Sequence, residues 1–560
     1  MLLRQAKPTP PGLTEAPLLS GGLPLVGHTV EFVRSTIGLL ERAHREHGEV
    51  AAIDVAGRRM VALFGPTAHE AVFRAKDAVL DPREAYKIMT PVFGEGMVYD
   101  APHDVMAEQF KMLLPALKDA RMRTYGETIL EEVQESIAGW GDEGELDVVD
   151  YCRVLTNFTS SHCLLGAEFR KGMTDEFARI YHDLERGVTP LAYINAHLPI
   201  PAFRQRDRAR ARLVELIGGI IDARVASGRT GEDFLQTLME ARYSNGRALT
   251  HDEITGMLLA AMFAGHHTSS VTTAWTLVEL CRHPAYLRRV IEELDGTYGE
   301  DGTTSYATLR SIPVTENAVK EALRLYPPLF MLIRVAMQDF SYGGHHLPKG
   351  TWLLVSPTVA HRMPEHFAHP LAFDPDRFAP PRSEDANAWA FIAFGGGRHK
   401  CMGNAFALLQ VKAILATLLR RYELELVTED VRPDFHGLVI GPSEPCRLRY
   451  RRRALARASV TVPQALTPTP QTLPDPSPEP AAPQASLRIT LDKDLCQGHA
   501  VCVGEAPEVF TLGDDGKVAL LTDRPDPQHH AAVRAAARYC PQRTIVLHEA
   551  PAAASACPFH

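Results

Sequence analysis

The sequence predicts two folded units, a large one that is mainly α-helical and a small one that follows it. Three observations support this prediction. The 560 residues exceed an ordinary domain of roughly 100 to 200 residues. Long amphipathic patterns with helical spacing recur before residue 455. Residues 462–485 are one-third proline and contain no aromatic residue, so they cannot bury enough apolar surface to fold. We therefore expect domains at residues 1–455 and 487–560, with a linker at 456–486.

Amphipathic helices are expected throughout the large unit, and the longest is the most informative. It is predicted to begin at Thr250, where the sequence Thr-His-Asp-Glu fits a capping box, and to end before Pro284. Because apolar residues surround almost the whole of its first half, we expect it to be buried. The other predicted helices are Thr36–His47, Thr124–Trp140, Ala209–Ala226 and Ala405–Arg421.

A polar run, Gly-His-His-Thr-Ser-Ser at residues 265–270, interrupts this apolar helix. Hydrogen bonds from serine hydroxyls to the preceding turn could account for Ser269 and Ser270. They account less well for two adjacent histidines in the middle of a buried helix. The pattern alone leaves both a structural and a chemical role open.

A glycine-rich loop, Phe-Gly-Gly-Gly-Arg-His-Lys-Cys-Met-Gly at residues 394–403, carries the strongest chemical signal. Its cysteine, Cys401, precedes a predicted helix, whose N-terminal N–H groups favour a thiolate. A thiolate is the proximal ligand that promotes O–O cleavage at a haem iron. The glycines allow the backbone to approach a flat macrocycle closely. Phosphate-binding loops are also glycine-rich, but the full ten-residue pattern is more specific.

Together with two further motifs, this loop resembles the cytochrome P450 superfamily over roughly residues 20–453. Glu321 and Arg324 stand at the family's Glu-x-x-Arg spacing. The sequence Phe-Asp-Pro-Asp-Arg-Phe at residues 373–378 resembles its meander motif, in which Arg377 would complete a buried ion network. The resemblance implies the cytochrome P450 fold, which is mainly α with small β-sheets, and a haem b cofactor.

Two segments resemble the sterol 14α-demethylases in particular. Residues 86–100 are similar to that family's substrate-loop signature, and residues 265–270 to its central-helix signature. Pro91 and two glycines interrupt the first segment, so we expect an ordered apolar lid over a pocket. The reaction implied is three successive oxygenations of the 14α-methyl group of a lanosterol-type sterol, which end in formate and a Δ14 double bond.

The same resemblance assigns roles to individual residues. Thr268 would orient dioxygen and its water, and His267 would deliver protons through an ion pair with Glu185. An aliphatic residue at the position of Ile88 would favour C4-dimethylated sterols such as lanosterol. The residues expected at the haem are Tyr86, Arg334, His399 and the iron ligand Cys401, and those expected at the sterol are Ile88, Phe93, Met97 and Tyr99.

The small unit carries a cysteine pattern that resembles a ferredoxin. Cys496 and Cys502 lie in Cys-Gln-Gly-His-Ala-Val-Cys, and Cys540-Pro follows, while His499 takes the place of a middle cysteine. Three cysteines can hold a 3Fe-4S cluster, whereas a 4Fe-4S cluster would need His499 or an exogenous fourth ligand. Zinc is an alternative, but the second close cysteine pair of most zinc sites is missing. We expect a small α+β ferredoxin-like domain in which Cys557 is not a ligand.

Charge and hydropathy argue against a nucleic-acid-binding protein and against a membrane-spanning one. A net charge of −9 and a pI of 6.2 provide no basic surface for nucleic acid. The sequence contains neither a stretch of about 18 apolar residues nor a signal peptide, so we expect no transmembrane segment and a cytoplasmic protein that contacts membranes peripherally. Because no flavin or nicotinamide segment is recognisable, an NAD(P)H-dependent ferredoxin reductase is the expected partner.

Two alternative functions remain. The protein could be a haem-thiolate monooxygenase of another lipid or a terpene with a sterol-like lid. It could also be a haem-based sensor or a sterol-binding protein. The fused electron carrier argues against the second alternative, because a sensor does not need a continuous supply of electrons.

Overall fold

The computed structural model describes residues 9–172, 175–188, 192–231, 233–298, 304–435, 439–454 and 486–550. The described residues up to 452 form one compact unit, and those from 486 onward form another. The predicted linker lies outside the described residues except for Ser486, as does Cys557. No helix among the described residues is long and apolar enough to span a membrane.

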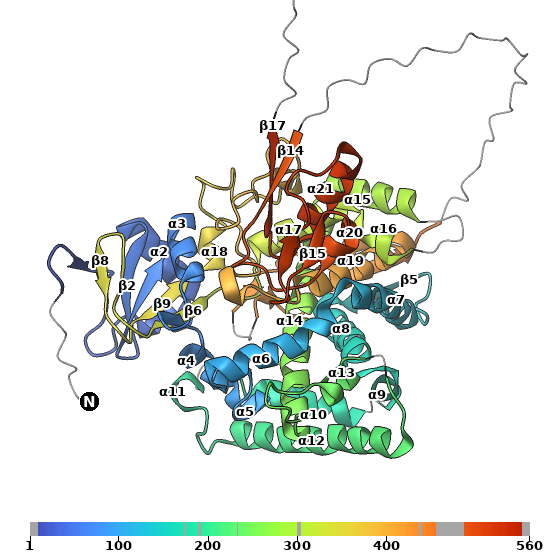
Figure 1. The fold of residues 1–560 in the computed structure, drawn as a ribbon, viewed down its shortest axis with the longest axis horizontal. Coiled ribbons are helices and arrows are strands. Elements are labelled where there is room, and N and C mark those ends of the chain that lie inside the picture. Colours follow the sequence, from blue (N-terminus) through green and yellow to red (C-terminus); the bar gives the residue numbers. More distant parts are fainter. Residues whose placement is uncertain are drawn as a thin grey trace, which may run out of the picture. The chain divides into compact units, whose positions relative to one another are not determined.

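The large unit is mainly helical, and its helices surround α14 (Figure 1). Its helices of four or more residues outside the lid are α1 (Thr29–Arg34), α2 (Thr36–His47), α3 (Pro66–Arg74), α6 (His103–Leu113), α7 (Asp119–Ser136), α8 (Val148–Leu165), α9 (Ala167–Gly172), α10 (Asp175–Arg186), α11 (Ala192–Asn195), α12 (Pro201–Ser227), α13 (Phe234–Glu240), α14 (His251–Arg282), α15 (Pro284–Thr297), α16 (Tyr306–Arg310), α17 (Pro313–Leu325), α18 (Pro357–Ala360) and α19 (Asn404–Arg421).

Helix α14 matches its prediction. Thr250 accepts a hydrogen bond from the N–H of Glu253, and the Glu253 side chain accepts one from the N–H of Thr250, so the capping box is present. The helix packs against α8, α12, α17 and α19, and most of its residues are buried. It therefore forms the central element on which the polar run lies.

Two predicted helix boundaries were wrong. Helix α7 covers Asp119–Ser136 rather than Thr124–Trp140, because it starts directly after the extended Lys118 and ends before a glycine-rich segment. Helix α12 starts at Pro201, not at Ala209. Alternating arginines in its first turns obscure the apolar pattern there, although Phe203 and Arg206 are buried.

Small sheets complete the large unit, as predicted for this fold class. The largest has the order β2-β3-β9-β6-β4 and lies beside the helical part (Figure 1). Only its β3–β9 pair is parallel. Its strands are β2 (Val50–Val55), β3 (Arg58–Leu63), β4 (Leu80–Asp81), β6 (Leu332–Ala336) and β9 (Trp352–Val355). One smaller sheet consists of β1 (Thr14–Glu15), β7 (Phe340–Tyr342) and β8 (His345–Leu347). Another consists of β5 (Glu143–Asp147), β10 (Tyr422–Leu426) and β13 (Arg447–Arg452). Strand β11 (Pro433–Asp434) pairs with β12 (Gly441–Pro442).

The small unit is an α+β fold, which confirms the predicted class. Strand β14 (Ser486–Leu491) pairs antiparallel with β17 (Ile545–Ala550), and β15 (Phe510–Leu512) pairs with β16 (Val518–Leu520). Helices α20 (Val501–Glu505) and α21 (His530–Tyr539) pack against each other. Their apolar faces form one core with the strands, in which Cys502 is buried.

Candidate functional site

The Cys401 loop has the tight backbone that its glycines suggest. Gly397 has a φ of +63°, and a Cβ atom there would lie 1.8 Å from the carbonyl oxygen of Phe73, so only glycine fits. The N–H of Cys401 donates to the carbonyl of Phe394 at 2.9 Å, which closes the loop directly before α19.

Cys401 is accessible and at the same time enclosed by protein. Its side chain is exposed, yet desolvation raises the pKa of its thiol above the ordinary value. Both properties together mean that protein atoms surround the thiol without covering it. Ala264 is also exposed, although it lies in the middle of α14, most of whose residues are buried. The structure thus leaves a thiol and a small residue of the central helix open to ligands.

Tyr86, Tyr99 and Arg334 form a basic and aromatic group in the same region as Cys401. Tyr86 and Tyr99 stack with their ring centroids 5.0 Å apart. Burial raises the pKa of Tyr99 to about 12, and the charges of Tyr86, Arg334 and Cys401 also act on it. Arg334 is 7% exposed and forms no ion pair with a carboxylate within the described residues, since its guanidinium donates only to the carbonyl of Ile333, at 2.9 Å. A buried guanidinium of this kind fits an anionic ligand such as a haem propionate.

His399 has an acidic partner that the sequence did not reveal. Its Nε2 lies 2.7 Å from Oδ1 of Asp77. Desolvation raises the pKa of Asp77, but the hydrogen bond to His399 and nearby positive charges outweigh it and lower the pKa overall. Asp77 therefore fixes the ring through Nε2, and Nδ1 of His399 is left for a second partner.

The lid consists of short helical turns, α4 (Arg83–Tyr86), η1 (Lys87–Met89), α5 (Thr90–Phe93) and η2 (Val98–Asp100). Gln109 of α6 holds them, because its Oε1 accepts from the N–H of Val98 at 2.7 Å and its Nε2 donates to the carbonyl of Gly96 at 3.0 Å. Arg210 of α12 donates to the carbonyls of Val92 and Phe93, both at 3.2 Å. Neither anchor was identified from the sequence, because the burial of Gln109 is seen only in the structure.

The lid lies directly on α14. A Cβ atom at Gly256 would be 2.1 Å from the carbonyl oxygen of Phe93, so this glycine permits the close approach. Among the predicted sterol contacts, Phe93 and Met97 are buried in one apolar cluster, and Ile88 packs against it half-buried. The Phe93 ring meets Phe263 edge to face at 6.0 Å, and Phe263 lies 5.3 Å from His267. The lid and the polar run of α14 are therefore neighbours.

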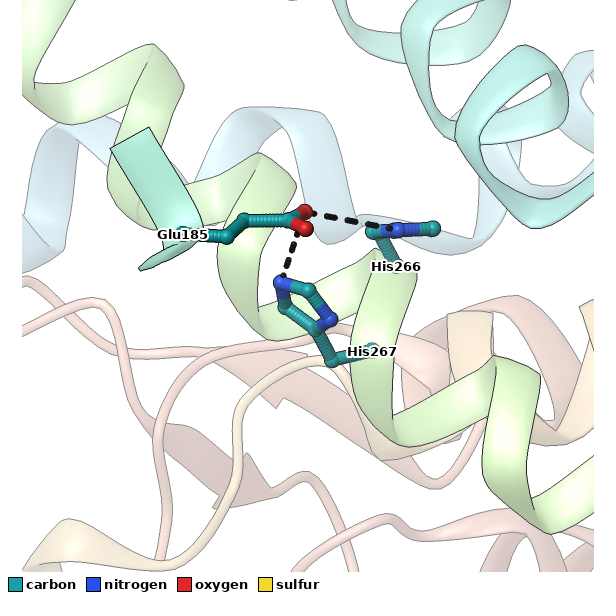
Figure 2. A group of neighbouring side chains, drawn as sticks. All are labelled: Glu185, His266 and His267. Atoms are coloured by element: carbon teal, nitrogen blue, oxygen red, sulfur yellow. Dashed lines mark ion pairs between the residues drawn. The ribbon is translucent and has the colours of Figure 1, made fainter. Parts of the chain in front are cut away.

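Glu185 of α10 lies close to both histidines of α14 (Figure 2). Its Oε1 is 3.1 Å from Nε2 of His267 and 3.7 Å from Nε2 of His266. The other nitrogen of His266, Nδ1, lies 2.9 Å from the hydroxyl of Thr156. Desolvation, followed by the charges of His267 and Arg153, lowers the pKa of His266 well below its ordinary value, so this ring is neutral.

Thr268 donates its hydroxyl proton to the carbonyl of Ala264 at 2.6 Å, which leaves its lone pairs free to accept. The hydroxyl of Ser269, for which such a bond was one possible reading of the sequence, is buried without a hydrogen-bond partner in the described part of the chain. The back-bonded residue is thus Thr268, whose half-buried side chain lies one turn from the exposed Ala264.

Glu321, Arg324 and Arg377 form a fully buried network. Each side chain is 0% exposed, and Glu321 lies 2.8 Å from Arg324 and 3.0 Å from Arg377. The remaining donors of Arg324 bind the carbonyls of His361, Pro370 and Ala372. Arg377 has a second carboxylate partner, Glu384, at 2.6 Å. This network joins α17 to the segment that leads to the Cys401 loop.

We expect Glu321→Gln to destabilise the large unit by about 3–5 kcal/mol, because it leaves the buried guanidinium of Arg324 without its carboxylate partner and leaves Arg377 with Glu384 alone. The free energy of unfolding, measured by denaturant titration, checks this. Glu70→Gln is the matched control, since Glu70 and Arg74 form a partly exposed pair, and we expect a change within about 0.5 kcal/mol. Equal effects of the two substitutions would contradict a structural role for the network.

The three cysteines of the small unit lie near one another. Desolvation and then the charges of Cys540 and Cys496 raise the pKa of Cys502 to about 11. The N–H of Val518 donates to Sγ of Cys496, and that of Thr544 to Sγ of Cys540, each at 3.3 Å. Such N–H···S bonds tune iron–sulfur clusters.

The distances among the three Sγ atoms can be compared with those around a single zinc ion. Thiolates on one zinc lie ~3.8 Å apart, given Zn–S bonds of about 2.3 Å. Within the described residues, the three Sγ atoms do not belong to any group of three ligand atoms that all lie within 4.8 Å of one another. The wider arrangement suits a cluster with several metal atoms. His499 is 5% exposed, and its Nε2 lies 3.4 Å from Oε1 of Gln497.

Comparisons with known proteins find relatives of both units of the chain. The cytochrome P450 family profile matches residues 17–448, and that of the 4Fe-4S single cluster domain matches residues 489–547. The sterol 14alpha-demethylase of Mycolicibacterium vanbaalenii is 43% identical over 446 residues, 78% of this chain and 98% of that protein. The lanosterol 14-alpha demethylase of Bos taurus is 35% identical over 80% of this chain and 90% of its own.

Solved structures agree on the fold. A cytochrome P450DA heme domain superposes with a TM-score of 0.71 at 24% identity and covers 79% of this chain and 98% of its own. The chain therefore has a haem-binding domain and an iron–sulfur domain. It belongs to the cytochrome P450 family and, within that family, to the sterol 14α-demethylases.

Proposed function

We propose that this protein is a sterol 14α-demethylase that carries its own electron-transfer domain and releases the 14α-methyl group of a lanosterol-type sterol as formate. The observation that carries the proposal is identity of 43% to a bacterial sterol 14α-demethylase over nearly the whole of that enzyme. The adjacent iron–sulfur domain supports a function that consumes electrons. An NAD(P)H-dependent ferredoxin reductase is the partner that we propose. We also propose domain boundaries at 1–455 and 487–560, consistent with the two matched regions.

When bound, the haem supplies oxygen activation and the cluster supplies electrons. In our proposal Cys401 is the iron ligand, because its thiol is exposed although protein atoms surround it. The cationic side chain of Arg334 has no carboxylate partner in the described residues and would pair with a propionate. Tyr86 would donate to the same groups, and Nδ1 of His399 would donate to them when the ring is protonated on both nitrogens.

For the small unit we propose that Cys496, Cys502 and Cys540 hold a 3Fe-4S cluster. Three thiols with an N–H···S network and a histidine in the fourth position support this choice. Electron paramagnetic resonance of the oxidised protein distinguishes the two cluster types, since an oxidised 3Fe-4S cluster gives a signal and an oxidised 4Fe-4S cluster of ferredoxin type does not. An oxidised protein that shows only the ferric-haem signal and holds four irons in the cluster would assign a 4Fe-4S cluster instead.

Proton delivery is the role that we propose for Glu185 and His267. The carboxylate is partly exposed and lies 3.1 Å from the imidazole, so it can exchange protons with solvent and pass them to the ring. Thr268 follows directly in the chain, and its free lone pairs can hold a water or orient dioxygen.

We expect Glu185→Gln to reduce sterol turnover by at least tenfold, in line with the usual contribution of about 10²–10⁴ from a proton-transfer group. Sterol-induced spin shifts and the reduced-CO spectrum should not change, because the residue touches neither ligand in this proposal. Asp183→Asn, on the same helix, is the matched control and should retain turnover. Unchanged turnover in Glu185→Gln would remove this residue from the proton path.

Substrate selection is assigned to the lid. Ile88 is half-buried beside the cluster of Phe93 and Met97, where its size can affect the fit of a sterol. We expect Ile88→Phe to shift the preference from C4-dimethylated toward C4-monomethylated sterols by roughly 10-fold, since one pocket contact changes discrimination by about 1–3 kcal/mol. Titration of both sterols, followed by the haem spin shift, measures this. A panel that also contains fatty acids and terpenes tests the alternative substrate classes, and preference for one of those would refute the sterol assignment.

We further propose that the large unit contacts membranes peripherally when it takes up sterol. Exposed apolar side chains are concentrated near its N-terminal end and support this proposal; they are Leu18, Leu23, Leu25, Val26, Val30 and Val33.

A further inference from the structure

We propose that Glu185, His266 and His267 form a binding site for Zn²⁺ or a similar transition-metal ion, which inhibits the enzyme when it is occupied. The ligand atoms are Oε1 of Glu185 and one nitrogen from each ring. All three atoms lie within 4.8 Å of one another. Figure 2 shows the carboxylate of α10 directed toward both imidazoles of α14.

A hydrogen bond fixes the tautomer of His266 in the form that a metal ligand requires. The hydroxyl of Thr156 donates its proton to the carbonyl of Cys152 at 2.8 Å. It must therefore accept from Nδ1 of His266, 2.9 Å away. Nε2 of His266 then carries a lone pair, and this lone pair faces Glu185 at 3.7 Å. A bond of this kind to the non-ligating nitrogen is what orients metal-binding histidines in general.

The same geometry leaves ligand atoms without hydrogen bonds. Oε1 of Glu185 and Nε2 of His267 are both buried and make no hydrogen bond within the described residues, although they lie 3.1 Å apart. The lone pair of His266 and the carboxylate oxygen also face each other as two acceptors. A cation between the three atoms would satisfy all of them.

The type of ligand indicates the type of ion. Two imidazole nitrogens and one carboxylate oxygen suit Zn²⁺, Co²⁺, Ni²⁺ or Cu²⁺ rather than Mg²⁺ or Ca²⁺, which prefer oxygen ligands. Ligand atoms around a tetrahedral zinc lie ~3.3 Å apart, given bonds of about 2.0–2.1 Å. The observed separations of 3.1 and 3.7 Å from Oε1 need only small adjustment. The side chains of Glu185 and His267 are 17% and 14% exposed, so an ion and a fourth, water ligand can enter.

Inhibition follows from the proposed function, on which this part of the inference rests. A bound ion would occupy the nitrogen and oxygen atoms that Glu185 and His267 use to carry protons. Sterol binding and the thiolate spectrum would be unaffected, because neither involves these atoms.

Equilibrium dialysis of the full-length holoprotein against Zn²⁺, with zinc, iron and haem measured, tests the site directly. We expect Glu185→Gln, His266→Gln and His267→Gln each to weaken the tightest zinc site by at least tenfold. His251→Gln is the matched control, because His251 lies on the same helix outside the cluster, and it should bind zinc as the parent does. Equal zinc binding by the parent and the three cluster variants would overturn the proposal.

Two substitutions of Thr156 test the site while all three ligand residues stay in place. Thr156→Val removes the hydrogen bond to His266 and should weaken zinc binding about 10-fold or more, whereas Thr156→Ser should preserve it. Identical affinities for valine and serine would show that the tautomer is irrelevant and would contradict the site as described. Inhibition of turnover by zinc is measured separately, so zinc binding by a protein that does not demethylate sterols would refute the proposed function and leave the metal site standing.

Discussion

Cys401→Ser is expected to abolish the thiolate-type reduced-CO absorption band and to lower sterol turnover below about 1% of the parent value. The physical reason is that only a thiolate supplies the electron density that favours O–O cleavage at a haem. A hundredfold loss corresponds to ~2.7 kcal/mol of transition-state stabilisation. Spectra and product formation are measured on the same preparation, with haem content as a check on folding.

Cys281→Ser is the matched control for that experiment. Cys281 lies in the same unit outside the loop, and its thiol donates to the carbonyl of Leu424 at 3.7 Å, a bond that a serine hydroxyl can replace. We expect this variant to retain the thiolate band and turnover. A thiolate band that survives in Cys401→Ser would show that another residue is the iron ligand.

Cys502→Ser should prevent normal assembly of the iron–sulfur cluster and reduce reductase-driven turnover to below about 5% of the parent value. Cys502 is buried in the core of the small unit beside two other thiols, so its loss removes one of three ligands and weakens metal binding strongly. Iron content, sulfide content and NADPH-driven product formation measure the effect. Turnover should return when a separate ferredoxin is added, because the large unit is untouched.

Cys557→Ala is the control here, since Cys557 is not expected to be a ligand. It should keep the cluster and full turnover. If Cys502→Ser turned over sterol normally without added ferredoxin, the small unit would not be the electron donor.

Contiguous motifs were the part of this molecule that sequence reasoning predicted well. The capping box at Thr250 involves residues three apart, and the structure contains it. Glu321 and Arg324 also form a local pair on one helix. In both cases short-range spacing determines which side chains meet, so a sequence pattern is sufficient.

Contacts between distant segments could not be predicted in this way. Asp77 meets His399 across more than 300 residues, and nothing near either residue indicates the pairing. The sequence around Thr156 does not distinguish it from other helical threonines. It contacts His266 because α8 packs against α14. Residues that hold the site in place, such as Asp77 and Thr156, can therefore be identified only from the packed structure.

Turnover by the purified full-length holoprotein tests the central claim most directly. Lanosterol, NADPH and a ferredoxin reductase are supplied without any separate ferredoxin, and formate and the Δ14 sterol are quantified. We expect both products in equal amounts, together with NADPH consumption that depends on sterol. A protein with a normal thiolate spectrum and an intact cluster, reduced by the reductase yet forming neither product, would contradict it.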